Sequence, residues 1–468
     1  MSLALELRDA LVAALGAEWV RADAATLERC SIDGIKRVRA RPDLVVFPGT
    51  TSEVAVVARA CNAARVPLVP RGAGTGYTGG AVPVRGGVVI SMERLTRILE
   101  IDQQNLVAVV GPNVITGDLQ DAVERVGLFY PPDPASLRQS VIGGNVAECA
   151  GGPRAFKYGT TRQYVLGLEA VLPTGEIVRT GGRTVKNVVG YDLTQLIVGS
   201  EGTLAIVTQV ILRLVPRPPT QVALRATFGS ITDAARAVSE VVHERVVPAT
   251  LELVDRESLV AASNYLGQHA LAPAGTEALL LIEVDGLAPA VDEEATRVEA
   301  ACRRAGALEL RRAADEQERE AFWEVRRALS ESLKTLAPLK LNHDVVVPKG
   351  RVPELFALIG ELRRRHGLRI ACFGHAGDGN IHVNMMVDPA DAAEVERAHR
   401  AEWELFRGVI TLQGAITGEH GVGVTKARFL PLSLSPDELA LMRRVKRAFD
   451  PNGILNPGKI FPDDVAEY

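Results

Sequence analysis

The spacing of apolar residues in the first half of the chain predicts amphipathic helices and short strands. Residues 1–35 alternate apolar and charged side chains at helical spacing, which predicts a helical lead-in. The run at 51–66 has the same periodicity, with Thr51 or Ser52 as its N-cap, and 115–127 is helical again. Strands rich in Val and Ile are predicted over 44–49, 67–71, 86–92 and 105–112, followed by mostly antiparallel strands over 165–215.

Three prolines mark the best domain boundary of the chain. Pro216, Pro218 and Pro219 end the strand pattern, and a new β/α alternation starts near residue 226. Helices are predicted near 232–245, 290–305, 316–334, 352–366 and 391–413, with strands between them. Such a mixture predicts an α+β domain with a largely antiparallel sheet. The tail at 450–462 is rich in turn residues.

Composition narrows the class of protein. The chain has 468 residues, of which 47% are hydrophobic and 24% charged, so we expect two or more globular units. With 53 basic and 57 acidic side chains, nothing favours nucleic-acid binding. Five scattered cysteines without a C-x-x-C pair exclude a Cys-ligated cluster within this chain and fit a reducing compartment. Without a signal-peptide pattern or a long apolar window, we expect a cytoplasmic protein with no membrane span.

The first glycine-rich loop, PRGAGTGYTGG (70–80), places five glycines within nine positions. Residues 74–79 match G-x-G-x-x-G, but the dinucleotide fingerprint needs a helix after the loop. The strand-like AVPVRGGVVIS follows instead, which argues against an NAD site. Successive residues free to adopt positive φ can turn their N–H groups toward one anion. We therefore favour a pyrophosphate cradle over a plain turn between strands.

Two further stretches, at 131–161 and 199–204, are also rich in glycine and small residues. They offer backbone donors rather than catalytic side chains. Three separated loops of this kind suggest a long cofactor that contacts the backbone at many places.

The richest chemistry lies in ACFGHAGDGNIHVNMM (371–386). Asp378-Gly379 is a strong two-residue hairpin signal, and folding about it would place His375 opposite His382. Directly opposed residues have Cβ atoms about 5 Å apart, so both imidazoles could bind one ion. Asn384 would face the same side of the strand.

A third ligand for such an ion comes from ITGEHGVG (416–423), where Glu419 and His420 lie in a small-residue loop. Two His and one carboxylate form a familiar divalent-metal set, although this set does not identify the metal. Isolated histidines are usually structural, and we expect that of the other five: His243, His269, His343, His366 and His399.

The three glycine-rich motifs, in their order, resemble the FAD-binding domain of the vanillyl-alcohol oxidase/p-cresol methylhydroxylase (PCMH) superfamily. Within it, the chain is most similar to the group of glycolate oxidase FAD subunits, D-lactate dehydrogenases and D-2-hydroxyglutarate dehydrogenases. The resemblance implies an α+β protein with a two-subdomain PCMH-type domain and an α+β substrate (cap) domain. The implied divisions are a lead-in (1–37), the FAD domain (38–217), the substrate domain (218–430) and a segment returning to the FAD domain (431–468).

The resemblance also implies a set of FAD contacts. Residues 70–80 would wrap the diphosphate, the second stretch would line the flavin and ribityl, and the third would contact adenine or its linker, with Asn456 closing over the cofactor. No His occurs in 70–80, which favours noncovalent FAD. The implied residues are Pro70, Arg71, Gly72, Ala73, Gly74, Thr75, Gly76, Gly79, Gly80, Pro134, Ser136, Gly143, Gly144, Asn145, Gly151, Gly152, Tyr158, Gly159, Thr160, Glu201, Gly202, Ile206 and Asn456.

By the same resemblance, His375, His382 and Glu419 would bind a divalent metal, Zn or Mn. His420 would accept the hydroxyl proton of the substrate, and Asn384 would orient it. The implied reaction is the oxidation of a D-2-hydroxy acid, of the glycolate or D-lactate class, to the 2-oxo acid. The α-hydrogen would leave as hydride to flavin N5.

The substrate of such an enzyme brings a carboxylate, which needs a cationic anchor. Arg326 and Ser330 lie at i and i+4 of a predicted helix and share one face. Arg326 fits the W-x-x-R element of the family, and its guanidinium can bind a carboxylate with two hydrogen bonds. An ordinary surface arginine is the alternative. Lys340 is a candidate for a second anionic group.

Two other functions stay open. A dicarboxylate such as D-2-hydroxyglutarate could be the substrate, with Lys340 binding its second carboxylate. A noncatalytic flavin-binding subunit would have no need of the paired His, Glu419, His420 and Arg326. Because the chain lacks a Cys cluster, the reduced flavin would pass electrons to an Fe–S subunit, a quinone, a cytochrome or an electron-transfer flavoprotein, unless oxygen serves. Any membrane association would be peripheral, through such a partner.

Overall fold

The computed structural model describes residues 2–268 and 273–462, which divide into two compact units. The first unit takes in 1–151, 160–217 and 419–468, and the second takes in 152–159 and 218–418. The second unit is therefore inserted into the first. Its boundary at Gly418 comes before the end at 430 that the sequence suggested.

The first unit contains a four-stranded sheet with the order β1-β2-β4-β3, in which β4 runs parallel to both its neighbours. The elements of this part are α1 (Ser2–Leu15), β1 (Val20–Arg21), α2 (Ala24–Arg29), β2 (Leu44–Val46), α3 (Thr51–Ala64), β3 (Leu68–Arg71) and β4 (Val88–Ser91). The N-cap of α3 is Thr50, whose hydroxyl accepts the N–H of Glu53, rather than Thr51 or Ser52 as expected.

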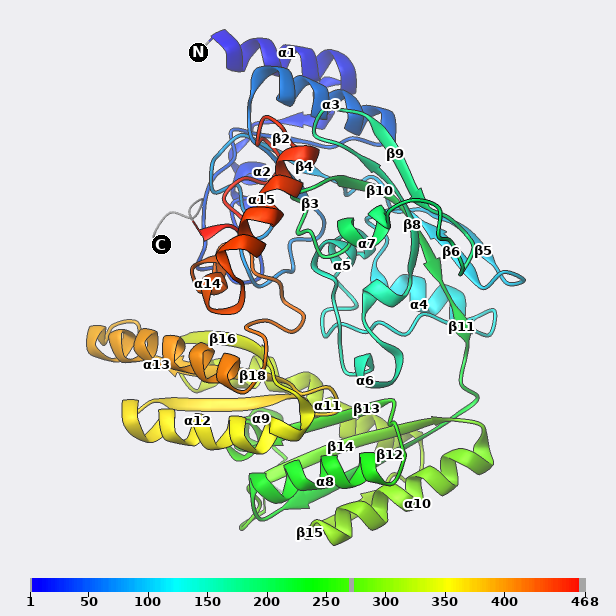
Figure 1. Cartoon of the computed structure of the whole chain (residues 1–468), viewed down its shortest axis with the longest axis vertical. Coiled ribbons are helices and arrows are strands. Elements are labelled where there is room, and N and C mark those ends of the chain that lie inside the picture. Colours follow the sequence, from blue (N-terminus) through cyan, green and yellow to red (C-terminus); the bar gives the residue numbers. More distant parts are fainter. Residues whose placement is uncertain (1, 269–272, 463–468) are drawn as a thin grey trace. The chain divides into compact units, whose positions relative to one another are not determined.

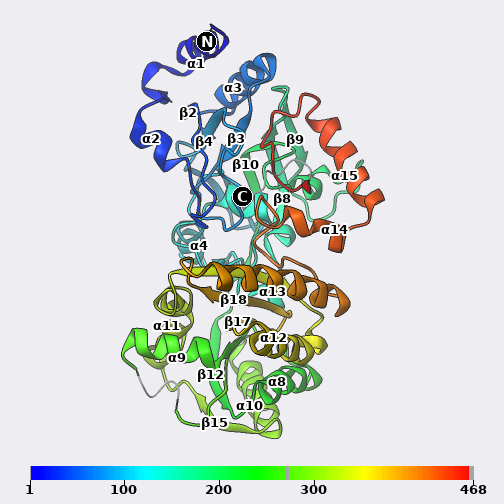
Figure 2. The same cartoon turned by 90° about the vertical axis from the view of Figure 1, so that its left-hand side faces the viewer.

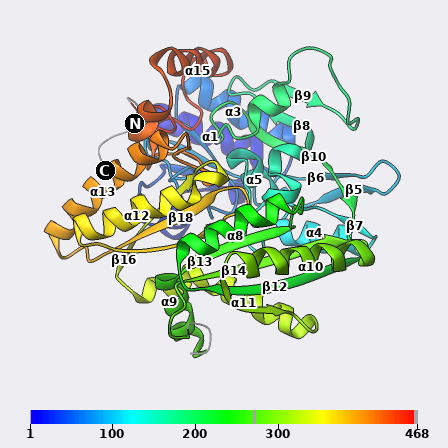
Figure 3. The ribbon, with the colours of Figure 1, turned by 60° about the horizontal axis from the view of Figure 1, so that its bottom comes forward.

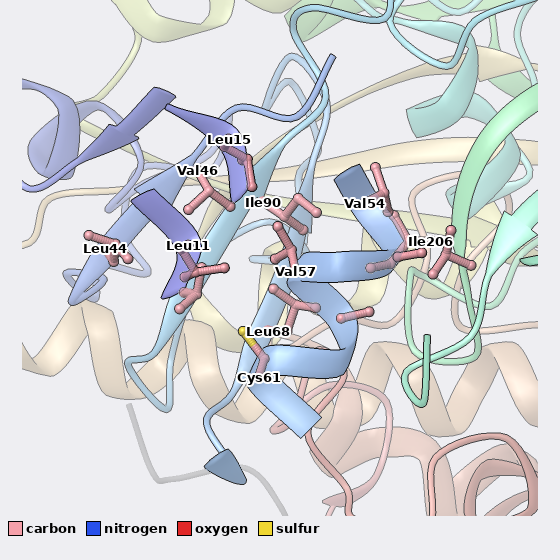
Figure 4. Packing of buried hydrophobic residues seen from close by; sticks show 14 of the residues in the cluster. Leu11, Leu15, Leu44, Val46, Val54, Val57, Cys61, Leu68, Ile90 and Ile206 are labelled. Atoms are coloured by element: carbon pink, nitrogen blue, oxygen red, sulfur yellow. The ribbon is translucent and has the colours of Figure 1, made fainter. Parts of the chain in front are cut away.

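The core of this part lies between α1, α3 and the sheet. Leu11 and Leu15 of α1 pack with Val54, Val57 and other residues of one buried cluster (Figure 4). The helices α1 and α3 thus cover one apolar face of this sheet, and Figure 2 shows them above β2 and β4.

The first unit also contains a fully antiparallel sheet with the order β5-β6-β10-β8-β9, and a separate two-stranded sheet of β7 and β11. This confirms the antiparallel strands expected over 165–215. The elements are β5 (Ile98–Asp102), β6 (Val107–Val110), α4 (Thr116–Glu124), β7 (Leu128–Phe129), α5 (Ile142–Glu148), β8 (Val165–Val171), β9 (Ile177–Gly181), α7 (Leu193–Ile197), β10 (Ile206–Arg213) and β11 (Val215–Pro216). The helices α14 (Leu430–Ser433) and α15 (Pro436–Phe449), red in Figure 1, belong to this unit too.

The second unit is built on one seven-stranded antiparallel sheet with the order β15-β12-β14-β13-β17-β18-β16. Its strands are β12 (Thr220–Phe228), β13 (Thr250–Asp255), β14 (Ala278–Gly286), β15 (Ala307–Arg312), β16 (Leu339–Val346), β17 (Arg369–His375) and β18 (Asn380–Val387). Its helices are α6 (Ala155–Tyr158), α8 (Ile231–His243), α9 (Arg256–Leu266), α10 (Ala288–Arg304), α11 (Glu316–Ser332), α12 (Val352–His366) and α13 (Ala392–Thr411).

The two faces of this sheet have different covers. Figure 3 shows α8, α10 and α12 side by side over one face. On the opposite face, Phe322, Val325 and Leu329 of α11 pack with Leu259 of α9 and Phe373 of β17. The polar site residues described below are interspersed with the apolar side chains of this α9/α11 face.

The hairpin between β17 and β18 differs from the expected two-residue turn. His375 pairs with Asn380, and His382 pairs with Phe373, so a four-residue loop closes the hairpin. Inside it, the N–H of Gly379 bonds to the carbonyl of His375, and Asp378 accepts the N–H of Asn380. Gly379 has φ +84°, and a Cβ there would collide with the carbonyl oxygen of Val347. The hydrogen bond from Asn380 to Asp378 and the close approach of Gly379 to Val347 both favour the four-residue loop over a two-residue turn.

Candidate active site

The three glycine-rich stretches come together around α5 in the first unit. A Cβ on Gly72 would lie 2.6 Å from Val141, the N-cap of α5, so the first loop packs there without a side chain. From the third stretch, Gly199 and Glu201 donate their N–H groups to Val146 and Ala147 of α5, at 2.9 and 2.8 Å. Stretches that are about 70 and 130 residues from the first loop therefore meet it in one place.

The loop at 70–80 has the freedom that an anion cradle requires. Gly74 and Gly79 adopt φ of +70° and +78°, and a Cβ on Gly76 would meet nothing within 4 Å. Buried Arg71 holds the loop by donating to the carbonyls of Ile32 and Arg29, at 2.9 and 3.3 Å. Residues 81–87 then lead into β4 without a helix, as expected of a loop that does not belong to an NAD site. This small-residue cradle fits the diphosphate of FAD.

Other predicted FAD contacts have structural partners of their own. Asn145 is buried and donates to the hydroxyl of Thr116 at 2.7 Å. The carboxylate of Glu201 accepts the N–H groups of Val422 and Gly423, at 2.7 and 2.6 Å. Asn456 donates to the carbonyls of Gly80 and Glu201, at 3.0 and 2.8 Å. The C-terminal segment thus binds both the first glycine loop and the third.

Three of the predicted FAD contacts belong to the second unit. Gly152, Tyr158 and Gly159 fall in the segment 152–159. There, the hydroxyl of Tyr158 donates to Asp285 at 2.6 Å, and Lys157 pairs with the same carboxylate. Their contact with FAD stays a prediction.

The Glu419-His420 pair lies in the first unit. The His420 ring stacks on that of Tyr77, from the first glycine loop, with centroids 5.3 Å apart and planes inclined by 30°. His420 Nε2 is 4.0 Å from a carboxylate oxygen of Glu419. A Cβ on Gly151 would lie 2.8 Å from the other oxygen, so a glycine there leaves room for Glu419.

The two predicted metal-ligating histidines of the second unit do lie together, in spite of the changed register. The rings of His375 and His382 have centroids 5.3 Å apart and planes inclined by 86°. Both side chains are buried. Two imidazoles at this separation are suitable ligands for one divalent cation.

A buried carboxylate lies behind each histidine. Glu252 of β13 accepts from His375 Nδ1 at 2.5 Å, and Asp344 of β16 lies 3.8 Å from His382 Nδ1. Asp344 also accepts from Asn380 at 2.6 Å and from the backbone N–H of Gly418 at 2.9 Å. Carboxylates in this position orient metal-binding imidazoles in many proteins.

Arg326 is buried on α11 and is not a surface arginine. Its Nε donates to Glu252, and its guanidinium carbon lies 5.0 Å from the ring centroid of Phe373. Its neighbour Arg327 is exposed and pairs with Glu320. Burial alone would raise the pKa of Glu252, but the charges of Arg326 and His375 lower that pKa to about 2. Glu252 is therefore ionised in the folded protein.

The other residues predicted to bind substrate lie on β18, β16 and α11. Asn384 is buried, and its side-chain oxygen accepts from Asn342 at 2.8 Å. Lys340 donates to the hydroxyl of Ser330 at 2.8 Å, and burial lowers the pKa of Lys340 to about 8. Asn342 and Lys340 precede Asp344 at intervals of two along β16, so all three face the side of His382 and Asn384.

Three of the five histidines expected to be structural have partners within their own unit. His343 lies 3.6 Å from Glu402, and His366 lies 3.2 Å from Glu404. His399 also lies 3.6 Å from Glu402. His269 falls outside the described residues.

Sequence reasoning missed Glu252 and Asp344. Each is a completely buried acidic residue inside a strand, within TLELVD and LNHDVV. A carboxylate that is fully buried in a sheet needs a partner, so an acidic residue inside a predicted strand was the signal that could have pointed to these two groups. The partners of both carboxylates lie far along the chain, so the sequence alone did not predict the pairing.

Two domain families match the chain. The FAD binding domain family matches residues 42–181, and the C-terminal domain of the FAD linked oxidases matches residues 217–460. The chain belongs to the FAD-linked oxidases. This confirms the expected family, the FAD cofactor and the assignment as an FAD-linked oxidoreductase.

Curated relatives of this family cover most of the chain. Glycolate oxidase subunit GlcD of Bacillus subtilis is 44% identical over 93% of this chain and 92% of its own. D-lactate dehydrogenase of Anaerostipes hadrus is 37% identical over 90% of each chain. D-2-hydroxyglutarate dehydrogenase of Stutzerimonas stutzeri is 36% identical over 94% of this chain and 96% of its own.

Solved structures confirm the PCMH-type fold. p-Cresol methylhydroxylase has a TM-score of 0.83 over 100% of this chain and 98% of its own, at 18% identity. 4-Ethylphenol oxidase from Gulosibacter chungangensis has a TM-score of 0.79 over 99% and 98%, at 21% identity. Among the residues that the structure describes, no helix is both long and apolar enough to cross a membrane.

Proposed function

We propose that this FAD-linked oxidoreductase oxidises a small D-2-hydroxy acid, of the glycolate or D-lactate class, to the 2-oxo acid. The observation that carries the proposal is the buried pair His375 and His382, which lies beside buried Arg326. The names of the relatives, glycolate oxidase subunit and D-lactate dehydrogenase, support the same class of substrate.

In this proposal, His375, His382 and Glu419 hold a divalent metal, Zn or Mn. Glu419 is the residue after Gly418, whose N–H is fixed by Asp344 in the second unit. When bound, the metal supplies a Lewis acid for the substrate hydroxyl, and FAD supplies the acceptor for the α-hydrogen as hydride.

The chain's own residues bind the substrate and move its proton. Arg326 binds the substrate carboxylate, and Asn384 orients the hydroxy acid for transfer of its Cα hydrogen. His420 Nε2 accepts the hydroxyl proton, as a general base that is part of a small-residue loop. Loss of this proton and of one hydride converts the 2-hydroxy acid to the 2-oxo acid.

The direct test is anaerobic reduction of the bound flavin. We expect glycolate or D-lactate to bleach the visible flavin absorbance, and L-lactate to leave it unchanged. Bleaching should be lost in His420→Gln and slowed in Arg326→Lys, since lysine cannot form the two-pronged carboxylate contact. A yellow protein that none of these acids bleaches would contradict the proposal and favour a noncatalytic flavin subunit.

A dicarboxylate substrate, D-2-hydroxyglutarate, is the second candidate. Lys340 supports this candidate, because this half-buried lysine lies beside Ser330 and on the same sheet face as Asn384. A relative is a D-2-hydroxyglutarate dehydrogenase. Adding this acid to the bleaching series, together with D-malate, separates the two candidates.

We further propose that the reduced flavin passes its electrons to a partner, an Fe–S subunit, a quinone, a cytochrome or an electron-transfer flavoprotein. The relative from Bacillus subtilis is named as a subunit, which supports a partner chain. All five cysteines are described and unpaired, as the cytoplasm would keep them. Reoxidation with air alone, at a rate equal to turnover, would contradict the need for a partner.

A further inference from the structure

Glu252 bonds both to the proposed metal-binding part of the site and to its proposed substrate-binding part. It lies on β13 directly opposite His375, and its side chain is completely buried. One carboxylate oxygen accepts from His375 Nδ1 at 2.5 Å. The other oxygen accepts from Nε of Arg326, on α11. One side chain thus bonds to a predicted metal ligand and to the predicted carboxylate anchor.

The bond to His375 determines which ring nitrogen is available. A carboxylate at Nδ1 favours the proton on that atom, and leaves the lone pair of Nε2 for a metal. The ring then cannot rotate without breaking a buried hydrogen bond. Glu252 in this way selects both the tautomer and the orientation of His375.

The bond to Arg326 determines which guanidinium edge is available. When Nε is held by Glu252, the Nη groups stay able to donate to a second carboxylate. The ring of Phe373 lies 5.0 Å from the guanidinium carbon and restricts its movement. Two donors on one buried carboxylate also mean that a shift of either group strains the other.

We propose that Glu252 is a positioning residue that aligns His375 for the metal and Arg326 for the substrate carboxylate at the same time. This inference rests on the function proposed above. It predicts that one substitution weakens the binding of both metal and substrate, although Glu252 contacts neither.

The chain offers a matched control in Glu283. This residue lies on the neighbouring strand β14, is buried, and accepts from Arg319 and Trp323 of α11 at 3.1 and 3.0 Å. Arg319 precedes Arg326 by seven residues on the same helix. Glu283 therefore makes the same kind of sheet-to-helix ion pair, with an indole N–H in place of the histidine.

The experiment compares Glu252→Gln and Glu283→Gln in the full flavin-containing protein. An amide keeps the size of the side chain but places an NH₂ group against one of the two donors. Zn²⁺ affinity of the metal-free protein is measured by competition with a chromophoric chelator. KM and kcat for the D-2-hydroxy acid are measured in parallel.

We expect Glu252→Gln to weaken Zn²⁺ binding by roughly 10- to 100-fold. Its KM should rise together with the loss of metal affinity, while Glu283→Gln stays within about twofold of the wild type in both. Equal metal affinity in Glu252→Gln and the wild type, or an equal loss in both variants, would overturn the inference.

A second variant keeps the inference testable if Glu252→Gln does not fold. Glu252→Asp retains the charge against Arg326 but is one methylene shorter, so its carboxylate cannot reach both donors. We expect weaker Zn²⁺ binding or a raised KM, and unchanged values for both would count against a positioning role.

The same data distinguish this inference from the proposed function. A wild-type protein that binds Zn²⁺, but that no 2-hydroxy acid bleaches, would contradict the function and leave the effect of Glu252→Gln on metal affinity measurable. A wild-type protein that is bleached by a D-acid but binds no Zn²⁺ or Mn²⁺ would overturn the inference and keep the oxidation.

Discussion

Buried charges stand out at the scale of single residues, because several of them belong to the cofactor cradle or the site. Buried Arg71 belongs to the first glycine loop, buried Asp33 accepts the N–H of Gly79 in that loop, and half-buried Lys340 lies on the face of the histidine pair. A buried ionisable group changes its protonation at a different pH from an exposed one. Two measurable pH effects follow, one on stability and one on catalysis.

Asp33 should make the protein less stable as the pH rises through its folded-state pKa. Burial raises the pKa of Asp33 to about 6, in spite of N–H donors from Ile35 and Gly79. Between pH 4 and 6 the folded state therefore binds more protons than the unfolded state, so the free energy of unfolding falls as the pH rises. Asp33→Asn removes this dependence.

Urea unfolding at pH 5 and 7 tests the effect of Asp33. The stability of the wild type relative to Asp33→Asn should fall by about 1 kcal/mol between these two values. A difference that stays constant, or grows with pH, would show that Asp33 does not titrate in this range.

Lys340 should give a pH dependence that only a dicarboxylate substrate reveals. Burial lowers the pKa of Lys340 to about 8, so its positive charge is lost above that pH. For D-2-hydroxyglutarate, kcat/KM should fall by up to about tenfold from pH 8 to 9, relative to kcat/KM for D-lactate. Lys340→Met should lower the value at pH 7 and abolish the difference. Parallel profiles for the two acids would exclude Lys340 as the second anchor.

The histidine hairpin shows, at the scale of elements, what the sequence could and could not predict. The helices over 316–332 and 352–366 agree closely with their apolar periodicity, whereas α9 was not predicted. The two histidines meet as expected, but across a four-residue loop. Turn signals depend on neighbouring residues only, whereas Gly379 contacts Val347, which lies 32 residues earlier in the chain. The sequence alone therefore did not predict the loop length.

The same reasoning explains why the supporting carboxylates escaped prediction. Glu252 and His375 are separated by 123 positions, and only the sheet order β13-β17-β18 brings them together. Residue types and spacing predicted the first groups of the proposed site. Its supporting groups depend on strand order, which hydrophobic periodicity does not encode.

Gly379→Ala should disrupt the hairpin far more than a comparable glycine elsewhere. A Cβ at Gly379 would enter the carbonyl of Val347, whereas at Gly367, with φ +60°, it would meet nothing within 4 Å. We expect Gly379→Ala to lower the free energy of unfolding by at least about 3 kcal/mol, and Gly367→Ala by about 1 kcal/mol. Urea titrations measure both, and equal losses would argue against the tight loop.

The insertion of the second unit into the first is the main feature at the scale of the whole molecule. The C-terminal segment, 419–468, returns to the first unit and pairs with β3, where Leu68 donates to Ile454 and accepts from Asn456. Completion of the FAD-binding unit therefore depends on residues from both ends of the chain.

Asn456→Ala should weaken FAD binding through this closure. The variant loses two side-chain donors, to Gly80 and Glu201, each contributing about 1 kcal/mol. We expect the Kd for FAD to rise at least about tenfold, as measured by flavin fluorescence. Asn452→Ala is the control, because exposed Asn452 in the same segment bonds to half-buried Asn62. Equal retention of FAD in both variants would contradict closure by Asn456.

The discontinuous first unit also has a consequence for biosynthesis. After Arg217 has left the ribosome, residues 218–418 must be made before Glu419 appears, which takes on the order of ten to forty seconds. During that time the edge of β3 lacks Leu455, and the cradle lacks Asn456 and the loop that Glu201 binds. The nascent chain can fold the inserted unit first, but the proposed cofactor cradle stays incomplete until residues 419–456 have been made.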